Sequence, residues 1–416
     1  MWLIKTMNIT HLCILCRGAK YLCGKAYCPI ITKVKLYSIA KHVINSRIIF
    51  GSTPPSIFVG RIGYPLIFVG PLTPPIVGDT AIFDLPELWN SIPIEEILYM
   101  RMSLVLARDE VRIQDMNSRF VQLLHELILS IKPIDIEIYL AKPPKKNFIL
   151  SDYEPPIGLR AQLETLRIAS SGVSHKVIEK VYYDYDLRAS EAIVKLYKAS
   201  IPITHIQKLL SIGALGIYKH RKLVPTRWAI TAVDDIVSRE LIKSIRSYPE
   251  ISNIQVFIRK IHKNLFFVIL IPGRWSFEWM EAWFPKSTWN PFGKEVVIEG
   301  DYELYMGRKE YPSIGGCYYA SRLAVAEYLN KVKRQAIAIV LREIYPGFDI
   351  PIGVWFVREQ LRALFKQKPI VVDTLEKALQ ILNNVSMLGV EKWKKHSILL
   401  RKLLYENKIW RYLKID

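Results

Sequence analysis

The sequence lacks any long uninterrupted apolar run. Its most apolar windows, such as residues 265–272 and 336–341, are flanked by charged residues. Both are far shorter than the ~20 residues that a membrane-spanning helix needs. The first residues also lack the long apolar segment of a secretory signal. We therefore expect a cytoplasmic protein that has no membrane partner.

Acidic residues are fewer than basic residues. The chain has 38 Asp and Glu residues against 58 Lys and Arg residues, which gives a formal net charge of +20. Such a surplus favours a polyanionic partner, either a nucleic acid or an anionic membrane surface. The plainer explanation is a set of solvated lysines in a generally basic proteome. Because half of the residues are apolar, the chain is long and apolar enough to form about two or three folded domains.

Cysteine is scarce, with 5 residues in 416, and four of them form one cluster. Cys13, Cys16, Cys23 and Cys28 have the spacing C-x2-C-x6-C-x4-C. Four thiolates can form a tetrahedral sulfur cage suited to structural Zn²⁺, with no open position for a catalytic water. The alternatives are two disulfides or a redox pair, which a cytosolic location disfavours, and uncoordinated thiols. We expect the fifth cysteine, Cys317, to be a small buried residue.

Local patterns predict strands and helices interspersed along the chain. Residues 134–140 alternate between apolar and polar side chains, which predicts a strand. Residues 118–131 predict a helix with Ser118 as its N-cap. Residues 391–404 predict an amphipathic helix. We expect an α/β fold, or a mixed α+β one, in which a small four-cysteine zinc module precedes two mixed helix/strand regions.

Three tryptophans recur at every fourth residue, at Trp275, Trp279 and Trp283. On a helix they would drift slowly around one face. An aromatic core stripe is the simpler interpretation, and a platform for stacking bases is the alternative.

Basic side chains next to aromatic ones predict contacts with nucleic acid. Arginine and lysine would neutralise phosphates, and exposed rings could stack on bases. The candidate residues are Lys219, Arg221, Lys222, Arg227, Trp228, Trp355 and Arg358, with His220 in the same stretch.

Pairs of acids offer a different hypothesis, a metal-dependent nuclease or another phosphodiester-processing enzyme. Asp234 with Asp235, and Asp301 with Glu303, could hold divalent ions for phosphodiester cleavage, as could Glu278 with Glu281. Asp301 and Glu303 would share one face of a strand, whereas adjacent acids would point apart. Acids close to arginine and tryptophan are more typical of structural ion pairs. We therefore favour a binding protein over an enzyme.

Several blocks of the sequence resemble the archaeal Nre proteins. They are the cysteine cluster up to Pro29, Phe58–Pro65, Val224–Asp235, Trp275–Trp283, Gly307–Tyr319, Arg334–Ala336 and Pro351–Glu359. The resemblance runs from about residue 11 to residue 365. It implies a DNA repair factor that binds DNA, the sliding clamp (PCNA), or both, at damaged sites.

The resemblance also implies a clamp-binding peptide near the C-terminus, of the form Gln-x-x-aliphatic-x-x-aromatic-aromatic. In residues 406–413, Ile409, Tyr412 and Leu413 fall at the required offsets. Glu406 stands where the pattern has glutamine, and a carboxylate cannot donate the amide hydrogen. A frayed amphipathic helix end is the alternative.

These observations divide the chain into four regions. They are the zinc module (1–32), an Nre-like N-terminal region (44–284), an Nre-like C-terminal region (291–400) and a tail with the degenerate clamp-binding motif (401–416).

Overall fold

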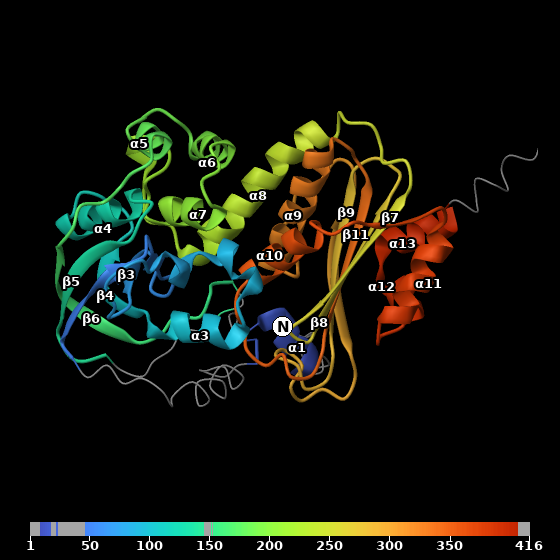
Figure 1. Ribbon diagram of the computed structural model, residues 1–416, viewed down its shortest axis with the longest axis horizontal. Coiled ribbons are helices and arrows are strands. Elements are labelled where there is room, and N and C mark those ends of the chain that lie inside the picture. The colour runs from blue at the N-terminus through green and yellow to red at the C-terminus, as the bar shows by residue number, and fades with distance from the viewer. Residues whose placement is uncertain (1–8, 18–21, 24–45, 145–150, 152, 407–416) are drawn as a thin grey trace, which may run out of the picture. The chain divides into compact units, whose positions relative to one another are not determined.

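The computed structural model describes residues 9–17, 22–23, 46–144, 151 and 153–406 (Figure 1). The chain divides into two compact units. Unit 1 comprises Met1–Thr32, Ser238–Pro351 and Val357–Asp416, and unit 2 comprises Lys33–Val237 and Ile352–Phe356. Both units contain strands and helices, so the expected mixed α/β fold is confirmed.

Unit 2 is built on a six-stranded sheet with the order β1-β5-β6-β4-β3-β2. Its strands are β1 (Ile48–Thr53), β2 (Ile57–Val59), β3 (Leu66–Thr73), β4 (Val105–Arg112), β5 (Ile134–Leu140) and β6 (Arg160–Ile168). Neighbours pair antiparallel, except β4 and β6, which are parallel. The predicted strand at residues 134–140 is confirmed, and its apolar residues are all buried because they share one face of the sheet.

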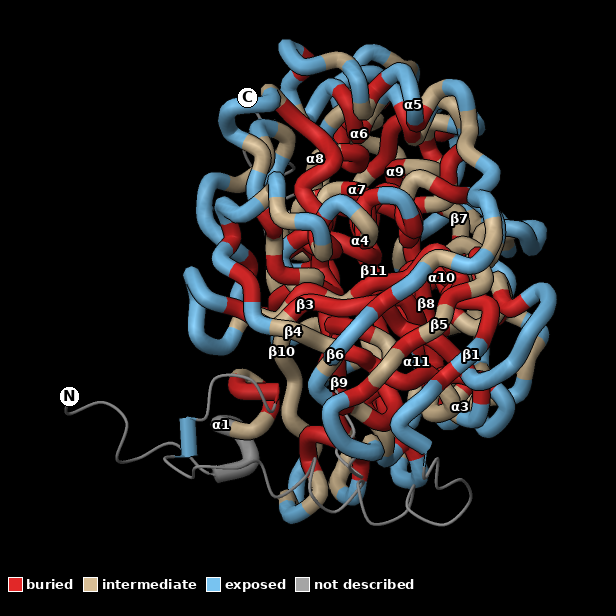
Figure 2. Tube along the Cα trace, turned by 90° about the vertical axis from the view of Figure 1, so that its left-hand side faces the viewer, coloured by how far each residue is buried: buried red, intermediate tan, exposed pale blue. Residues whose placement is uncertain are grey.

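The helices of unit 2 come mainly after β3 and after β6. They are η2 (Ala81–Asp84), η3 (Pro86–Ser91), α3 (Ile94–Ser103), α4 (Arg119–Leu129), α5 (Lys176–Tyr182), α6 (Ala189–Lys198), α7 (Ile203–Ser211), η4 (Tyr218–His220) and the start of α8 (Thr226–Ile245). The predicted cap of α4 is confirmed, since the Ser118 hydroxyl accepts a hydrogen bond from the Val121 amide at 3.3 Å. Helix α7 is buried over most of its length (Figure 2).

A buried ionic cluster connects η2, α3 and α7 of unit 2. The Asp84 carboxylate lies 2.5 Å from Arg101 Nη1 and 2.6 Å from Lys208 Nζ. It also accepts a hydrogen bond from the Ser56 hydroxyl. Burial by itself raises the pKa of Asp84, but the two cations more than offset this, so the pKa lies below its usual 3.8. The carboxylate is therefore charged and neutralises cations that come from two different helices.

Unit 1 contains a second six-stranded sheet, with the order β10-β9-β11-β8-β7-β12. Its strands are β7 (Ile254–Ile261), β8 (Asn264–Ile271), β9 (Ser276–Trp283), β10 (Val297–Glu303), β11 (Ile337–Ile344) and β12 (Ile370–Val372). The β9/β11 pair is parallel and the other neighbours are antiparallel. Every residue of β8 is buried, as expected for a strand covered on both faces.

Helices cover both faces of this sheet (Figure 1). On one face lies α9 (Gly316–Val332). On the other lie α11 (Leu375–Val385), α12 (Val390–His396) and α13 (Ile398–Arg401). The second face forms an apolar core in which Met280 and Leu341 of the sheet share a cluster with Leu382, Trp393 and Leu400 of the helices. Unit 1 also contains α1 (Ile9–Cys16), most of α10 (Trp355–Leu364) and the π-helical turn η5 (Lys402–Glu406).

The helix interpretation of the tryptophan stretch is wrong, because residues 276–283 form strand β9. A spacing of four residues is also a multiple of the two-residue period of a strand. Trp275, Trp279 and Trp283 therefore share one face, and all three are buried. Met280 and Ala282 on the opposite face are buried as well, so no polar alternation was left in the sequence to reveal the strand.

The prediction of one continuous helix at residues 391–404 is also wrong. It is divided into α12 and α13 at Ser397, and η5 follows. Ser397 has extended backbone angles and caps α13, since its hydroxyl accepts a hydrogen bond from the Leu400 amide at 3.0 Å. The same hydroxyl donates to the buried carboxylate of Glu278. A tertiary contact therefore interrupts the helix at this point.

None of the helices in the described part of the chain combines the length and the apolar composition that a membrane span requires.

The ionic cluster of unit 2 predicts a large effect of substituting Asp84. Asp84→Asn should lower the free energy of unfolding by about 3–5 kcal/mol, because it leaves the buried charges of Arg101 and Lys208 without a counter-charge. Urea unfolding followed by circular dichroism measures this loss. Glu164→Gln is the matched control. It removes the exposed Arg47–Glu164 pair, whose side chains are 60% and 57% exposed, and should cost at most about 1 kcal/mol. Equal losses in the two variants would contradict the prediction.

Candidate nucleic-acid interface

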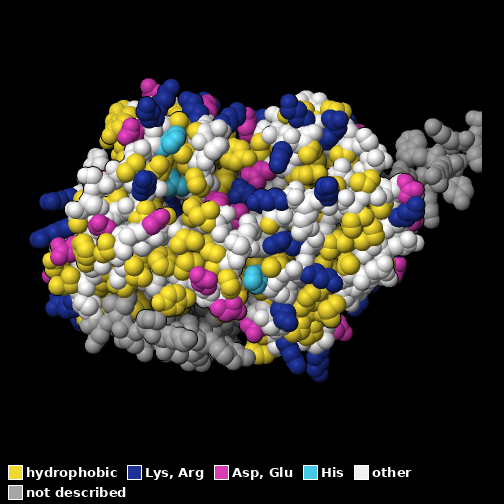
Figure 3. Space-filling view, viewed as in Figure 1, with side chains coloured by type: hydrophobic (Ala, Val, Ile, Leu, Met, Phe, Trp, Pro, Cys, Tyr) yellow, Lys and Arg dark blue, Asp and Glu magenta, His cyan; other side chains and the backbone are white. Residues whose placement is uncertain are grey.

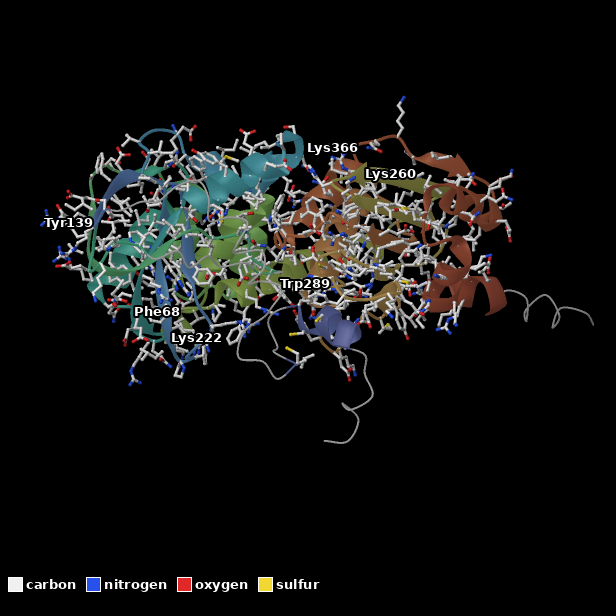
Figure 4. The ribbon with its side chains drawn as sticks, turned by 90° about the horizontal axis from the view of Figure 1, so that it is seen from below. Phe68, Tyr139, Lys222, Lys260, Trp289 and Lys366 are labelled. Atoms are coloured by element: carbon white, nitrogen blue, oxygen red, sulfur yellow. The ribbon has the colours of Figure 1, made fainter. Side chains whose placement is uncertain are left out.

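Most of the residues predicted to bind nucleic acid lie between the turn η4 and the first turn of α8, in unit 2. Tyr218 is 54% exposed and Trp228 is 45% exposed. Lys219 and Lys222 are exposed between them. Lys222 lies at the outer margin of the molecule in Figure 4. Both lysine side chains can therefore reach a ligand in solution.

Arg221 differs from these lysines, since its hydrogen bonds are directed inward. It donates to the backbone carbonyls of Gly216 and Tyr182, both at 2.8 Å. Its guanidinium carbon lies 5.4–5.9 Å from the ring centroids of Tyr182, Tyr185 and Tyr218. Burial lowers the pKa of Arg221, and the tyrosines act in the opposite direction. The arrangement makes Arg221 a positioning residue for the tyrosines.

Tyrosines next to Arg221 add to the exposed aromatic surface. Tyr183 is 63% exposed and Tyr185 is 51% exposed. The Tyr185 and Tyr218 rings lie 5.0 Å apart between centroids, as do those of Tyr182 and Tyr183. Tyr182 is anchored by its hydroxyl, which lies 2.9 Å from Nδ1 of the buried His125. The exposed rings are therefore attached to the core of unit 2.

A second aromatic pair joins the β2–β3 turn to α8. The Tyr64 ring, 43% exposed, lies 5.4 Å from the ring of Trp228 between centroids. The turn is closed by a hydrogen bond of 3.0 Å from the Leu66 amide to the Gly63 carbonyl. Gly63 has φ +88°, and a Cβ there would lie 2.6 Å from the Leu66 carbonyl oxygen. Glycine is therefore required for the turn that presents Tyr64.

Backbone hydrogen bonds connect the three segments that carry these rings with a fourth segment, residues 112–119. The Ile113 amide donates to the Pro65 carbonyl at 3.1 Å, and the Leu223 amide donates to the Ile113 carbonyl at 2.9 Å. The Tyr218 amide donates to the Tyr185 carbonyl at 2.8 Å. We call the exposed residues of segments 62–66, 112–119, 183–188 and 218–228 the aromatic–basic surface. Its exposed rings are Tyr64, Tyr183, Tyr185, Tyr218 and Trp228.

Positive charge predominates on the aromatic–basic surface. Its exposed cations are Arg112, Arg119, Arg188, Lys219 and Lys222, and its exposed acids are Asp115 and Asp186. The excess of exposed cations over exposed acids is moderate. The aromatic–basic surface thus combines limited charge with many aromatic rings.

On the single face of the molecule drawn in Figure 3, lysine and arginine side chains are scattered among hydrophobic ones and do not form one large basic patch.

The other predicted binding residues are less accessible. The Arg227 guanidinium carbon lies 3.7 Å from the ring centroid of the buried Tyr153. Trp355 is 3% exposed and packs edge-on against Trp89, and Arg358 is 1% exposed and lies 3.4 Å from the Glu359 carboxylate. Since Trp355 and Arg358 are buried, they do not form part of the aromatic–basic surface.

The acids that suggested a nuclease are held by structural partners. Asp301 lies 2.5 Å from Arg308, and Glu303 lies 2.9 Å from Arg322 while it accepts a hydrogen bond from Trp275. Asp234 is fully buried and accepts a hydrogen bond from the Gln207 amide at 3.1 Å. Its neighbour Asp235 is half-buried on the same helix, α8. Asp301 and Glu303 do lie on a strand, as expected, but their oxygens face arginines.

Glu278 and Glu281 lie on opposite faces of β9, so they are not a pair. Glu281 is bound by Arg17 at 2.7 Å and by Arg342 at 2.9 Å. Glu278 accepts hydrogen bonds from the start of α13, with the Ile398 amide at 2.7 Å. Burial raises the pKa of Glu278, although these hydrogen bonds oppose the shift. Across the described residues, no group of three or more His, Cys, Asp or Glu side chains is placed to hold a metal ion.

The predicted zinc cluster is described only in part. Cys13 and Cys16 lie on α1, where Cys16 is buried, and Cys23 is exposed. Cys28 lies outside the described residues, and so do Ile409, Tyr412 and Leu413 of the predicted clamp-binding motif. Cys317 is buried, as expected, and its sulfur accepts a hydrogen bond from Arg17 at 3.4 Å.

Sequence reasoning missed Tyr64, Tyr183, Tyr185 and Tyr218. The available signals were Tyr64 in the Gly-Tyr-Pro turn, the tyrosine-rich run at residues 182–185, and Tyr218 directly before Lys219. None of these signals shows which rings are exposed.

The fold and the surface together define a two-unit mixed α/β protein with an exposed aromatic and basic site. The sequence of the chain matches two family descriptions, "Archaeal Nre, N-terminal" over residues 22–290 and "Archaeal Nre, C-terminal" over residues 303–412. The chain belongs to the archaeal Nre family.

Curated relatives agree with this assignment. The chain is 47% identical to DNA repair protein NreB of Archaeoglobus fulgidus, across 94% of this chain and 97% of the relative. It is 39% identical to DNA repair protein NreA of the same organism, across 88% and 92%. It is 33% identical to DNA repair protein NreA of Haloferax volcanii, across 84% and 88%. No solved structure matches the chain.

Proposed function

We propose that this protein is a DNA repair factor that binds DNA through the aromatic–basic surface of unit 2. The observation that carries the proposal is its 47% identity, over nearly its whole length, to a protein named for DNA repair. The exposed lysines of the surface supply phosphate contacts, and its rings supply contacts to bases.

Binding is favoured over cleavage by the surroundings of the acids. Asp301, Glu303 and Glu281 each bind a neighbouring arginine, so binding a divalent ion would require breaking an ion pair. Asp234 is buried and accepts a hydrogen bond from Gln207. These partners give each acid a structural role that accounts for its position without a reaction.

The DNA-binding proposal predicts a steep dependence of affinity on salt. Lys219→Ala/Lys222→Ala should reduce the slope of log K against log[salt] by about 1.4–1.8, because two phosphate contacts are lost. Fluorescence anisotropy with a labelled oligonucleotide between 50 and 200 mM salt, roughly the range over which such contacts weaken most, measures the slope.

The matched control, Lys132→Ala/Lys142→Ala, removes two exposed lysines that flank β5 and should leave the slope nearly unchanged. A flat slope in the wild type, or equal reductions in both double variants, would count against the proposal.

We further propose that Cys13, Cys16, Cys23 and Cys28 bind a structural zinc ion. Four thiolates suit zinc, and the described part of the cluster fits this use. Cys13 and Cys16 are three residues apart on α1 and so lie on one face of that helix. Arg17 then has φ +46°, and its amide donates to the Cys13 carbonyl at 2.8 Å, which closes the helix end. When bound, the ion would hold the segments on either side of residues 18–21 together.

Zinc binding predicts about one zinc ion per chain in the purified protein, measured by inductively coupled plasma mass spectrometry. Cys13→Ser/Cys16→Ser should abolish the bound zinc, because two of the four ligands are lost. Cys317→Ala removes a cysteine outside the cluster and should retain the full content. A metal-free wild type would refute the proposal.

A third proposal concerns the tail, where Ile409, Tyr412 and Leu413 would dock on the sliding clamp. The spacing of these residues supports the proposal. So does the match to the C-terminal family description, which continues to residue 412. Tyr412→Ala/Leu413→Ala should abolish binding to the cognate clamp in a calorimetric titration. Glu406→Gln should tighten binding by about fivefold, since a glutamine amide can donate the hydrogen bond that a carboxylate cannot. Absence of binding by both the wild type and Glu406→Gln would exclude this role.

A further inference from the structure

Five exposed aromatic rings on one surface require a physical explanation beyond packing. Tyr64, Tyr183, Tyr185, Tyr218 and Trp228 are each 43–63% exposed, on segments joined by backbone hydrogen bonds. Ile62, in the same turn as Tyr64, is 77% exposed. Leaving this much apolar area in water is unfavourable, and contiguous exposed apolar surface commonly marks a binding site.

The rings are fixed by the residues beneath them. Arg221 is surrounded by three tyrosine rings and donates to backbone carbonyls, so it orders Tyr185 and Tyr218. The Thr226 hydroxyl accepts a hydrogen bond from the Val59 amide at 2.9 Å, which ties the start of α8 to the strand before the Tyr64 turn. Pre-ordered rings lose little conformational entropy on binding, which favours recognition by stacking.

The charge and chemistry of the surface select the type of ligand. In duplex DNA the faces of the bases are stacked on one another, so a protein ring cannot cover them unless the duplex opens. An unpaired base offers its face to any aromatic ring, whatever the sequence. The exposed cations outnumber the exposed acids by five to two, which suits a phosphate backbone but gives only modest attraction to a duplex.

We propose that the aromatic–basic surface binds single-stranded DNA by stacking unpaired bases on the Tyr64–Trp228 and Tyr185–Tyr218 pairs, while Lys219, Lys222 and Arg112 contact the phosphates. This inference rests on the proposed DNA-binding function and specifies its substrate class. It assigns a role to three tyrosines, Tyr64, Tyr185 and Tyr218, and makes Arg221 their positioning residue.

The test compares four probes on the full-length protein by fluorescence anisotropy. They are a labelled oligothymidylate, a mixed-sequence single strand, its blunt duplex, and a strand of equal length that is mostly abasic. Wild type should bind both base-containing single strands more tightly than the duplex. It should bind the abasic strand at least about fivefold more weakly than the base-containing strands, because every lost stacking contact is worth about 1–3 kcal/mol.

Variants locate the effect on the surface. Tyr64→Ala/Trp228→Ala should weaken binding to the single strands by at least about fivefold, with little change for the abasic strand. Trp228→Phe keeps an aromatic face and should retain most of the affinity. Phe50→Ala is the matched control, because Phe50 is also 50% exposed in unit 2 but lies on the edge strand β1. Its affinity should equal that of the wild type.

The outcomes separate this inference from the proposed function. Equal affinity for single strand, duplex and abasic strand, with a steep salt slope, would leave DNA binding in place and overturn stacking. The same conclusion would follow if Tyr64→Ala/Trp228→Ala, with an unchanged melting curve, bound the single strands like the wild type. Absence of binding to every probe would overturn both.

Discussion

Pairing of buried charges is the constraint on which both units depend. Asp84 in unit 2, and Glu281 and Glu303 in unit 1, each face one or two buried cations. An unpaired charge at any of these positions would cost several kcal/mol, so each fold is stable only when distant segments come together. Arg17 and Glu281 are 264 residues apart in the chain. Arg17 directly follows Cys16, the last residue of α1. The Arg17–Glu281 ion pair therefore also anchors the cysteine-bearing helix α1 to the sheet of unit 1.

The same constraint separates the structural acids from the surface that faces solvent. Paired acids resemble a catalytic cluster in the sequence, yet in the fold Asp301 and Glu303 each bind an arginine and Glu278 accepts hydrogen bonds from helix amides. On the aromatic–basic surface of unit 2, lysines and aromatic rings remain exposed. This division of roles is consistent with the proposed DNA-binding function, which would combine modest electrostatic attraction with many apolar contacts.

Membership of the Nre family and the chemistry of the surface support each other. Relatives named for DNA repair match 84–94% of the chain, which covers both units. Unpaired bases arise wherever a duplex is damaged or opened, so a surface that stacks such bases would direct a repair factor to those places. A tail that docks on a clamp would add a second contact to the first, and two linked contacts bind more tightly than either alone.

The sequence by itself determined the strands and helices with clear periodicity, such as β5 and the capped α4, and the family. It also showed that Lys219, Lys222 and Trp228 belong to one basic and aromatic stretch. Only the tertiary structure decided that Ser276–Trp283 is a strand, because a spacing of four residues fits both the helical and the strand period when both faces are buried. Tertiary packing also placed Arg358 and Trp355 in the interior. It brought the ring of Tyr64 next to that of Trp228, although the two residues are 164 positions apart in the chain. Exposure and pairing are properties of contacts between distant segments, and no local pattern encodes them.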